Sequence, residues 1–221
     1  MRVVAVSVAL PRPVAHGRST VSTGIFKHPV NGPVRVHAEH LEGDGQADRL
    51  HHGGPDKAVY AYGLEHYAWW EQTLGCEPLP PGQFGENLTV SGLDESVLCV
   101  GDQLAIGSAR FVITQPRVPC FKLGLRFGDP SMPQRFARSL RSGVYLRVLE
   151  QGEISAGDTV DVVAPAKRRI NIRSLFAAYL TPNERDSQDM LAAALAVPGL
   201  SAGWHRQISE RLAHRGHPSA D

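Results

Sequence analysis

The chain has 221 residues, of which 42% are hydrophobic and 20% are charged, and its 23 Lys and Arg nearly balance its 22 Asp and Glu. This length allows one large domain, or a domain with a small addition, and it excludes a mini-protein that depends on disulfides. Because phosphate-binding surfaces normally carry a large excess of Lys and Arg, we expect neither nucleic acid nor a membrane as the main partner, and small molecules are the favoured ligands.

Short segments with alternating apolar residues dominate the chain up to about Pro165 and predict β-strands. The predicted strands are Val3–Leu10, Ser22–Lys27, Val34–Leu41, Ala58–Tyr62, Asn87–Val90, Gln103–Ile106, Arg110–Thr114, Val144–Leu149 and Thr159–Val163. Two helices, Leu64–Leu74 and Ser131–Leu140, interrupt them. This pattern favours a mainly β fold, with an antiparallel sheet that closes into a β-barrel, over a doubly wound α/β sheet.

The sequence changes in character after Pro165, where helix-forming residues replace the alternating pattern. Three helices are predicted there, at Arg173–Leu180, Glu184–Val197 and Ala202–His214. Ser201 is a suitable N-cap for the third helix. We therefore expect a β-barrel domain over residues 1–165 and a three-helix domain over residues 166–221. The second holds eight Lys and Arg against five Asp and Glu, a mild excess that favours an ordinary solvated surface.

Nothing in the sequence indicates a membrane or secreted protein. The longest apolar run, Met190–Val197, has eight residues, far fewer than the roughly 20 that span a bilayer. The first apolar segment is followed by Pro11, Arg12 and Pro13 rather than by a signal-peptide cleavage pattern. The three cysteines, an odd number, argue against a disulfide framework and favour a reducing, cytoplasmic location.

A cluster of histidines is the first functional hint, since six of the ten lie within residues 28–66. This stretch includes HHGGPDK, residues 51–57, in which two glycines allow close approach of the backbone to a ligand. His52, Asp56 and Lys57 add a titratable donor, a carboxylate and a cation. The loop suits an anion or a polar heterocycle, and a loop of ordinary surface residues is an equally good interpretation.

Three other positions carry weaker signals. His37 and His40 fall in one predicted strand, where residues three apart face opposite sides, so we expect no shared metal ion. Lys27 suits either an exposed strand end or the wall of an anion pocket. The segment PGQFGENL, residues 81–88, suits presentation of Asn87 to a bound group. Taken alone, however, it reads as a turn.

The segment QPRVPCFKL places a thiol in a proline-flanked loop after a predicted strand. Arg117 and Lys122 lie on either side of Cys120, and nearby cations favour the thiolate, the form that attacks electrophiles or binds metals. Cys120 is therefore the cysteine with the strongest functional signal. Cys76 and Cys99 are interpreted as small buried apolar residues.

Together these segments resemble the MOSC family, the domain named after the C-terminal part of molybdenum cofactor sulfurase, and most closely its YiiM-type members, which are associated with resistance to 6-N-hydroxylaminopurine. The resemblance rests on GIFKHPV, LEGDGQADRLHHGGPDKAVYAY with the following EHYAWW, PGQFGENLTVSGL and QPRVPCFKL, and it extends to GLSAGWHRQISERL near the end. Four motifs in the expected order are far more specific than any one of them.

The resemblance implies a barrel-like fold whose pocket holds a pterin-dithiolene molybdenum cofactor, with Cys120 as the protein ligand to molybdenum, a role that suits a soft thiolate. Lys27, Lys57, Asn87 and Arg117 match positions that line such a pocket and hold the cofactor or the substrate. The implied reaction is reduction of an N-hydroxylated base or amine to the amine with loss of water.

The remaining expectations concern protons and electrons. His52 is the favoured proton donor, because an unperturbed histidine has a pKa of about 6.5. Three cysteines are too few for an iron–sulfur cluster of this chain's own. Electrons are therefore expected from a separate flavin or iron–sulfur protein. No segment corresponds to a pyridoxal-phosphate sulfurase domain, so cofactor sulfuration by this chain alone is not expected.

Two alternatives share the same residues. The first is a non-catalytic module that binds or hands over the molybdenum cofactor, with sulfur carried on Cys120. The second is a metal-free thiol enzyme in which Cys120 is the nucleophile and His52 the base. Metal analysis distinguishes the metal-free thiol enzyme from the two hypotheses that involve molybdenum. A turnover assay distinguishes the cofactor carrier from the reductase.

Overall fold

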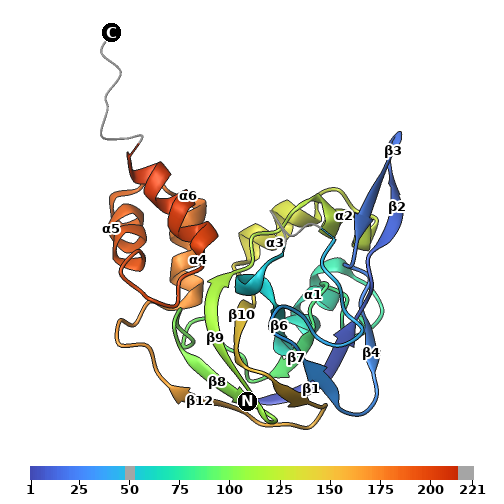
Figure 1. Cartoon of the computed structure of the whole chain (residues 1–221). Coiled ribbons are helices and arrows are strands. Elements are labelled where there is room, and N and C mark those ends of the chain that lie inside the picture. Colours follow the sequence, from blue (N-terminus) through green and yellow to red (C-terminus); the bar gives the residue numbers. More distant parts are fainter. Residues whose placement is uncertain (48–52, 214–221) are drawn as a thin grey trace.

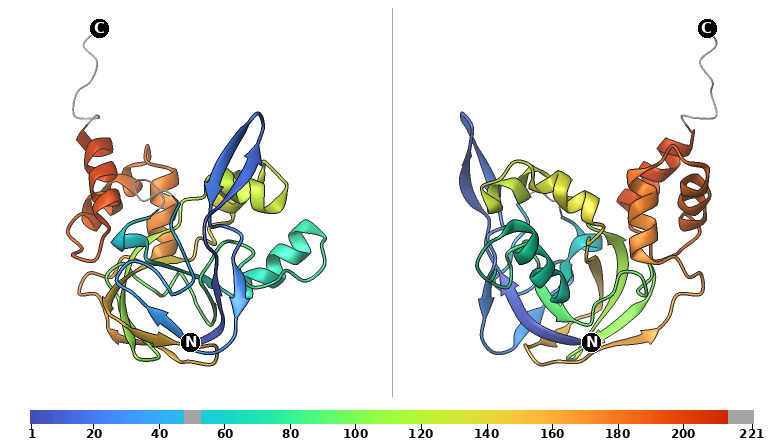
Figure 2. Two further views of the ribbon diagram at one scale, coloured as in Figure 1. Left: turned by 45° about the vertical axis from the view of Figure 1, so that its right-hand side comes forward. Right: turned by 180° about the vertical axis from the view of Figure 1, so that it is seen from behind.

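The computed structural model describes residues 1–47 and 53–213 (Figure 1). A curved sheet forms the body, and three C-terminal helices lie to one side of it in each view (Figure 2). No helix within these described residues is long and apolar enough to cross a membrane.

The strands are short and mostly antiparallel. Their bounds are β1 (Arg2–Val8), β2 (Arg12–His16), β3 (Ser19–Thr23), β4 (His28–Val30), β5 (Val34–Val36), β6 (Val59–Gly63), β7 (Leu88–Ser91), β8 (Gln103–Ile106), β9 (Ala109–Pro116), β10 (Val144–Glu150), β11 (Gly152–Ile154) and β12 (Val160–Ala164). The main sheet has eight strands in the order β12-β8-β9-β10-β6-β7-β1-β4, in which only the neighbours β6 and β7 run parallel. Two ribbons, β5 with β11 and β2 with β3, complete the set for the described residues.

The expected mainly β fold is confirmed, but full closure of the sheet into a barrel is not. β12 and β4 end the eight-stranded sheet and do not pair with each other among the described strands. Instead β1 approaches the start of β12 through one bridge, between Arg2 and Thr159. There the amide of Val3 donates to the carbonyl of Asp158 at 2.9 Å. The sheet is therefore strongly curved and only partly closed.

The described helical elements include two that the sequence did not predict, at residues 55–57 and 121–127. Their bounds are η1 (Pro55–Lys57, a 3₁₀ turn), α1 (Glu65–Leu74), α2 (Phe121–Phe127), α3 (Met132–Ser139), α4 (Ile172–Leu180), α5 (Arg185–Ala194) and α6 (Ala202–Ala213). The prolines at 116 and 119 signal a loop, which hides α2 from sequence patterns. The predicted cap of α6 is confirmed, because the hydroxyl of Ser201 accepts a hydrogen bond from the amide of Trp204 at 3.1 Å.

Two clusters of buried side chains hold these elements together. The larger is continuous from the sheet, where it includes Ile113 and Leu146, into the C-terminal helices, where it includes Leu175 and Trp204. The smaller cluster is rich in aromatic residues and packs α1, α2 and α3 against β6. Fully burying one such side chain stabilises a fold by about 1.5–3 kcal/mol. The aromatic cluster also supports the polar cavity described next.

Candidate functional site

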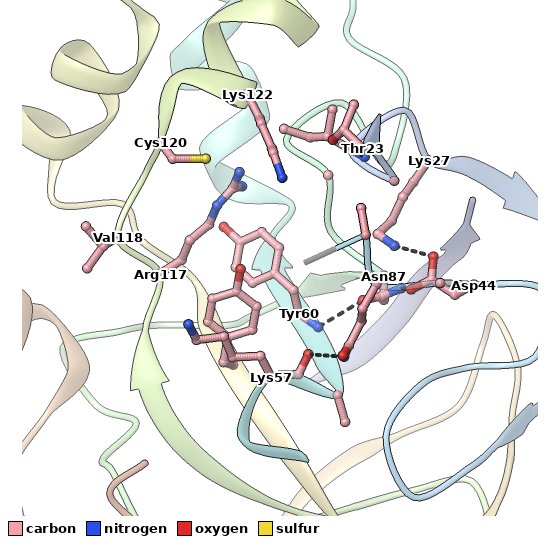
Figure 3. Close-up of a pocket in the computed structure, with 18 residues that line it drawn as sticks. Thr23, Lys27, Asp44, Lys57, Tyr60, Asn87, Arg117, Val118, Cys120 and Lys122 are labelled. Atoms are coloured by element: carbon pink, nitrogen blue, oxygen red, sulfur yellow. Dashed lines mark hydrogen bonds and ion pairs between the residues drawn. The ribbon is translucent and has the colours of Figure 1, made fainter. Parts of the chain in front are cut away.

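A polar cavity of about 120 Å³ brings five of the six sequence-predicted site residues together. It lies where β6, the loop after β9 and the segment after β3 meet, and Figure 3 shows these side chains around one space. The predicted residues that line it are Lys27, Lys57, Asn87, Arg117 and Cys120. The sixth, His52, lies outside the described residues.

Cys120 occupies the N-cap position of α2, at the rim of the cavity (Figure 3). Its backbone is extended, with φ −129° and ψ 175°, and its side chain is partly exposed. Lys122, one residue into α2, lines the same cavity from above. A partly exposed thiol beside cations has the surroundings of a reactive or metal-binding cysteine.

Arg117 is a buried cation held in a fixed orientation. It donates a hydrogen bond to the carbonyl of Phe84, and its guanidinium lies 4.8 Å from the ring centre of Tyr60 and 5.4 Å from that of Phe136. Only 6% of the residue is exposed. Stacking on two aromatic rings leaves little conformational freedom, so Arg117 presents a preorganised positive charge to the cavity.

Lys27 is buried and paired with a residue that the sequence did not single out. Its ammonium forms an ion pair with Asp44, so the exposed alternative for Lys27 is wrong. Burial lowers the pKa of Lys27, and Asp44 opposes this shift. The carboxylate of Asp44 also accepts from the amide of Ala9 at 2.9 Å, which anchors the pair to the end of β1.

Asn87 lies in the floor of the cavity, and its side chain is already engaged in hydrogen bonds within the protein. Its side-chain carbonyl accepts from the Tyr60 amide at 3.0 Å, and its amide nitrogen donates to Asp44 at 2.9 Å and to the Ser7 carbonyl at 3.2 Å. With both ends of the side chain engaged, Asn87 ties β6 to β1 and orients Asp44. It remains in the cavity wall, and its predicted role as a direct binder remains a prediction.

Lys57 lines the cavity from a loop that is fastened on two sides. On one side, the side-chain amide of Gln46 donates to the Lys57 carbonyl at 3.2 Å and accepts from the Gly54 amide at 2.7 Å. On the other side, Asp56 accepts from Nε of Arg147 at 2.6 Å and from the amide of Ala202 at 2.8 Å. Asp56 therefore connects the cavity loop directly to the first turn of α6.

We expect Asp56→Ala to lower the free energy of unfolding by about 1–2 kcal/mol, since the variant loses an N-terminal acceptor of α6 and leaves Arg147 without its carboxylate. Hydrogen exchange should also accelerate in residues 53–58 and in the first turn of α6. Asp161→Ala is the matched control, because within the described part of the chain this exposed aspartate accepts a hydrogen bond only from Thr159, at 3.0 Å. Equal losses in denaturant unfolding of the two variants would contradict the proposed connection.

The cavity also contains neutral donors that sequence reasoning missed. Burial raises the pKa values of Tyr60 and Tyr145, against the opposing effect of Arg117, so both phenols remain protonated at neutral pH. Tyr60 donates its hydroxyl proton to the carbonyl of Ser142 at 2.8 Å. Tyr145 lines the cavity, and its hydroxyl forms no hydrogen bond with the described part of the chain. Tyr145 lies outside the motifs, and Tyr60 lies in one of them but was not singled out as a site residue.

Two expectations about other residues are wrong. Cys76 is exposed rather than buried, because it follows α1 after the left-handed Gly75 and leaves the core. His37 and His40 do not point apart, because β5 ends at residue 36 and a turn stacks their rings with centroids 4.8 Å apart. The described residues still contain no group of three or more His, Cys, Asp and Glu side chains suited to a metal ion. Cys99 is buried as predicted, and burial raises the pKa of its thiol.

Sequence and structure comparisons agree with one another. A profile of the MOSC domain matches residues 48–161, and one of the YiiM-like, 3-alpha helix domain matches residues 178–215. The chain is 35% identical over 209 residues to the uncharacterized protein YflK of Bacillus subtilis, a match that covers 95% of this chain and 93% of that protein. It is also 35% identical over 146 residues to a protein of Gibberella moniliformis named Reductase, covering 65% of this chain but only 26% of that protein.

The crystal structure of YiiM from Geobacillus stearothermophilus has the same fold, with a TM-score of 0.80 and 32% sequence identity. The superposition covers 96% of this chain and 98% of that one. These matches extend over the sheet, the cavity and the C-terminal helices. We conclude that this chain belongs to the MOSC domain family and carries a YiiM-like 3-alpha helix domain after its sheet.

Proposed function

We propose that this protein binds a molybdenum cofactor around Cys120 and reduces N-hydroxylated bases or amines, such as 6-N-hydroxylaminopurine, to the corresponding amines. The observation that carries the proposal is the convergence of a partly exposed thiol and four cationic side chains on one cavity. Family membership supports the association with a molybdenum cofactor, and the relative named Reductase supports oxidoreductase chemistry.

The residues present suit such a cofactor. Cys120 offers a soft sulfur ligand of the kind that molybdenum accepts beside dithiolene sulfurs. Lys27, Lys57, Arg117 and Lys122 line the cavity, and this set of positively charged side chains suits an anionic group such as a phosphate. Pockets for whole drug-sized ligands measure about 300–1,000 Å³. The described residues line about 120 Å³ and would hold one part of the cofactor.

The net reaction consumes two electrons and two protons for each N–O bond broken: R–NHOH + 2 e⁻ + 2 H⁺ → R–NH₂ + H₂O. When bound, the molybdenum cofactor supplies the two-electron chemistry. In this proposal Cys120 holds the metal, while Arg117 and Lys57 hold anionic groups in place. The protonated phenol of Tyr145 offers a hydrogen bond to a substrate oxygen, and His52 remains the predicted proton donor.

We expect protein purified from a host that makes the cofactor to contain close to one molybdenum per chain. With methyl viologen reduced by an electrode as the donor, it should convert 6-N-hydroxylaminopurine to adenine, followed by liquid chromatography. Molybdenum without turnover would leave only the cofactor-carrier alternative. Absence of molybdenum would refute the proposal and favour the metal-free thiol enzyme.

The predicted role of His52 as proton donor is tested with a variant of this residue. If His52 supplies the proton, His52→Ala should lower turnover around neutral pH while the molybdenum content remains unchanged. Full turnover of His52→Ala across neutral pH would remove this histidine from the mechanism. The cofactor assignment would be unaffected, because molybdenum content is measured separately.

A further inference from the structure

The β2–β3 hairpin stands out from the body beside α2 (Figures 1 and 2). Thr23, the last residue of β3, lines the cavity that holds Cys120. Two aromatic contacts join these elements. The ring of His16 stacks on that of Phe121 with centroids 4.7 Å apart, and the guanidinium groups of Arg12 and Arg126 lie 4.5 and 5.3 Å from the ring centre of Phe26. Hairpin and helix therefore form one continuous face, which we name the hairpin face.

The hairpin face is positively charged and is built from segments without any carboxylate. Residues 1–38, which include the hairpin, contain no Asp or Glu, and neither do residues 103–128, which include α2. Its basic side chains are Arg12, His16, Arg18 and Arg126. The near-neutral charge of the whole chain thus conceals a local excess of cations beside the cavity.

An apolar side chain, Phe121, lies on the hairpin face against His16. It is 43% exposed and directly follows Cys120. An exposed aromatic residue surrounded by basic side chains has the composition of a protein-binding surface, with a hydrophobic centre and a charged rim.

The proposed function requires an electron donor, and the role that we infer for the hairpin face rests on that proposal. Reduction of an N-hydroxylated substrate needs two electrons per turnover, and the three cysteines of this chain cannot hold an iron–sulfur cluster. A donor must therefore approach the cavity closely, and the hairpin face lies at its rim. Positive surfaces steer acidic partners to productive encounters at low ionic strength.

We propose that the hairpin face docks an acidic electron-donor protein, which carries a flavin or an iron–sulfur cluster, beside the cavity of Cys120. Each turnover takes two electrons from the donor, one from each of two molecules where the donor is a one-electron carrier such as a [2Fe–2S] ferredoxin. With two protons, these electrons end in the amine and the water that replace the N–O bond. Phe121 contacts the donor, while Arg12 and Arg18 pair with its carboxylates. Nucleic acid is disfavoured, because the face is a small convex hairpin with an apolar centre.

Charge reversal on the hairpin tests the proposal with a reduced plant-type [2Fe–2S] ferredoxin, an acidic protein, as the probe. We expect Arg12→Glu/Arg18→Glu to raise the Kd for ferredoxin at least tenfold at 20 mM NaCl and to weaken its dependence on salt. Arg185→Glu/Arg206→Glu makes the same charge change on exposed positions of α5 and α6 and should alter the Kd less than twofold. Because Arg12 also contacts Phe26, Arg18→Glu alone is measured too, with an expected loss of about threefold.

Turnover rates measured with two different electron donors distinguish an effect on docking from an effect on the reaction itself. With ferredoxin as donor, Arg12→Glu/Arg18→Glu should lose at least tenfold in rate, whereas with reduced methyl viologen it should match the wild type, since neither arginine lines the cavity. Equal losses in the α5 and α6 control, or tighter binding of a single-stranded DNA oligonucleotide than of ferredoxin, would overturn the proposal. Lack of turnover with viologen would instead refute the proposed function, and the binding measurement would still decide docking.

Discussion

Cys120→Ser is expected to lose most of its molybdenum and at least a hundredfold in turnover. A serine hydroxyl is a harder ligand than a thiolate and stays protonated at neutral pH, so it does not replace sulfur toward a metal that prefers soft donors. The thiol forms no hydrogen bond within the described part of the chain, and it is partly exposed, so the fold should not change. Metal analysis by mass spectrometry and circular dichroism together test this expectation.

The control for this variant is Cys76→Ser, which changes the same atom at an exposed position after α1, outside the residues that line the cavity. It should retain wild-type molybdenum and turnover. If Cys120→Ser also retained its metal, Cys120 would not be the ligand, and the cofactor would have to be held by the cationic side chains alone.

Glu86→Ala is expected to lower the free energy of unfolding by about 3–5 kcal/mol, because each buried donor left without an acceptor costs about 1–3 kcal/mol and the site relaxes in part. Glu86 has no exposed surface. It accepts from the amides of Gly82 at 2.8 Å and Phe84 at 3.1 Å, from the hydroxyl of Thr89 at 2.8 Å, and from the phenol of Tyr67. Denaturant unfolding followed by tryptophan fluorescence measures the loss.

Thr89→Val provides the matched control for Glu86→Ala. It removes one donor of the same cluster and keeps the shape of the side chain, so a loss of about 1 kcal/mol is expected. Loss of Glu86 should also disturb the position of Arg117 in the cavity. Glu86 organises the loop that contains Phe84, and the carbonyl of Phe84 accepts the hydrogen bond of Arg117. If Glu86→Ala were no less stable than Thr89→Val, Glu86 would not organise this loop.

Local patterns in the sequence were sufficient for most strands and helices. The strand at Gln103–Ile106 has the predicted bounds, and the three C-terminal helices lie where the loss of β-branched alternation placed them. The patterns missed β2, β4, β11 and α2, and proline accounts for three of these four. β2 and β4 contain Pro13 and Pro29, and α2 follows Pro119, so a residue that normally signals a turn concealed regular structure.

The motifs predicted which residues meet, but not what each one contacts. Lys27, Lys57, Arg117 and Cys120 were selected from three separate segments, and the fold gathers them around one cavity. Asp44 was missed, because an aspartate in a glycine-rich turn carries no signal of its own. Its role arises from the ion pair with Lys27 and from the hydrogen bond with Asn87, partners 17 and 43 residues away.

Local periodicity and residue type were enough to predict the mainly β class and the C-terminal helices, and the resemblance to the MOSC family supplied the pocket residues. The folded structure added three features: the sheet closes only partly, Asn87 is tied into the cavity floor, and Asp56 joins the cavity loop to α6. It also placed two carboxylate-free segments side by side as one basic face. Such features depend on hydrogen bonds, ion pairs and ring contacts between distant residues, which no local pattern specifies.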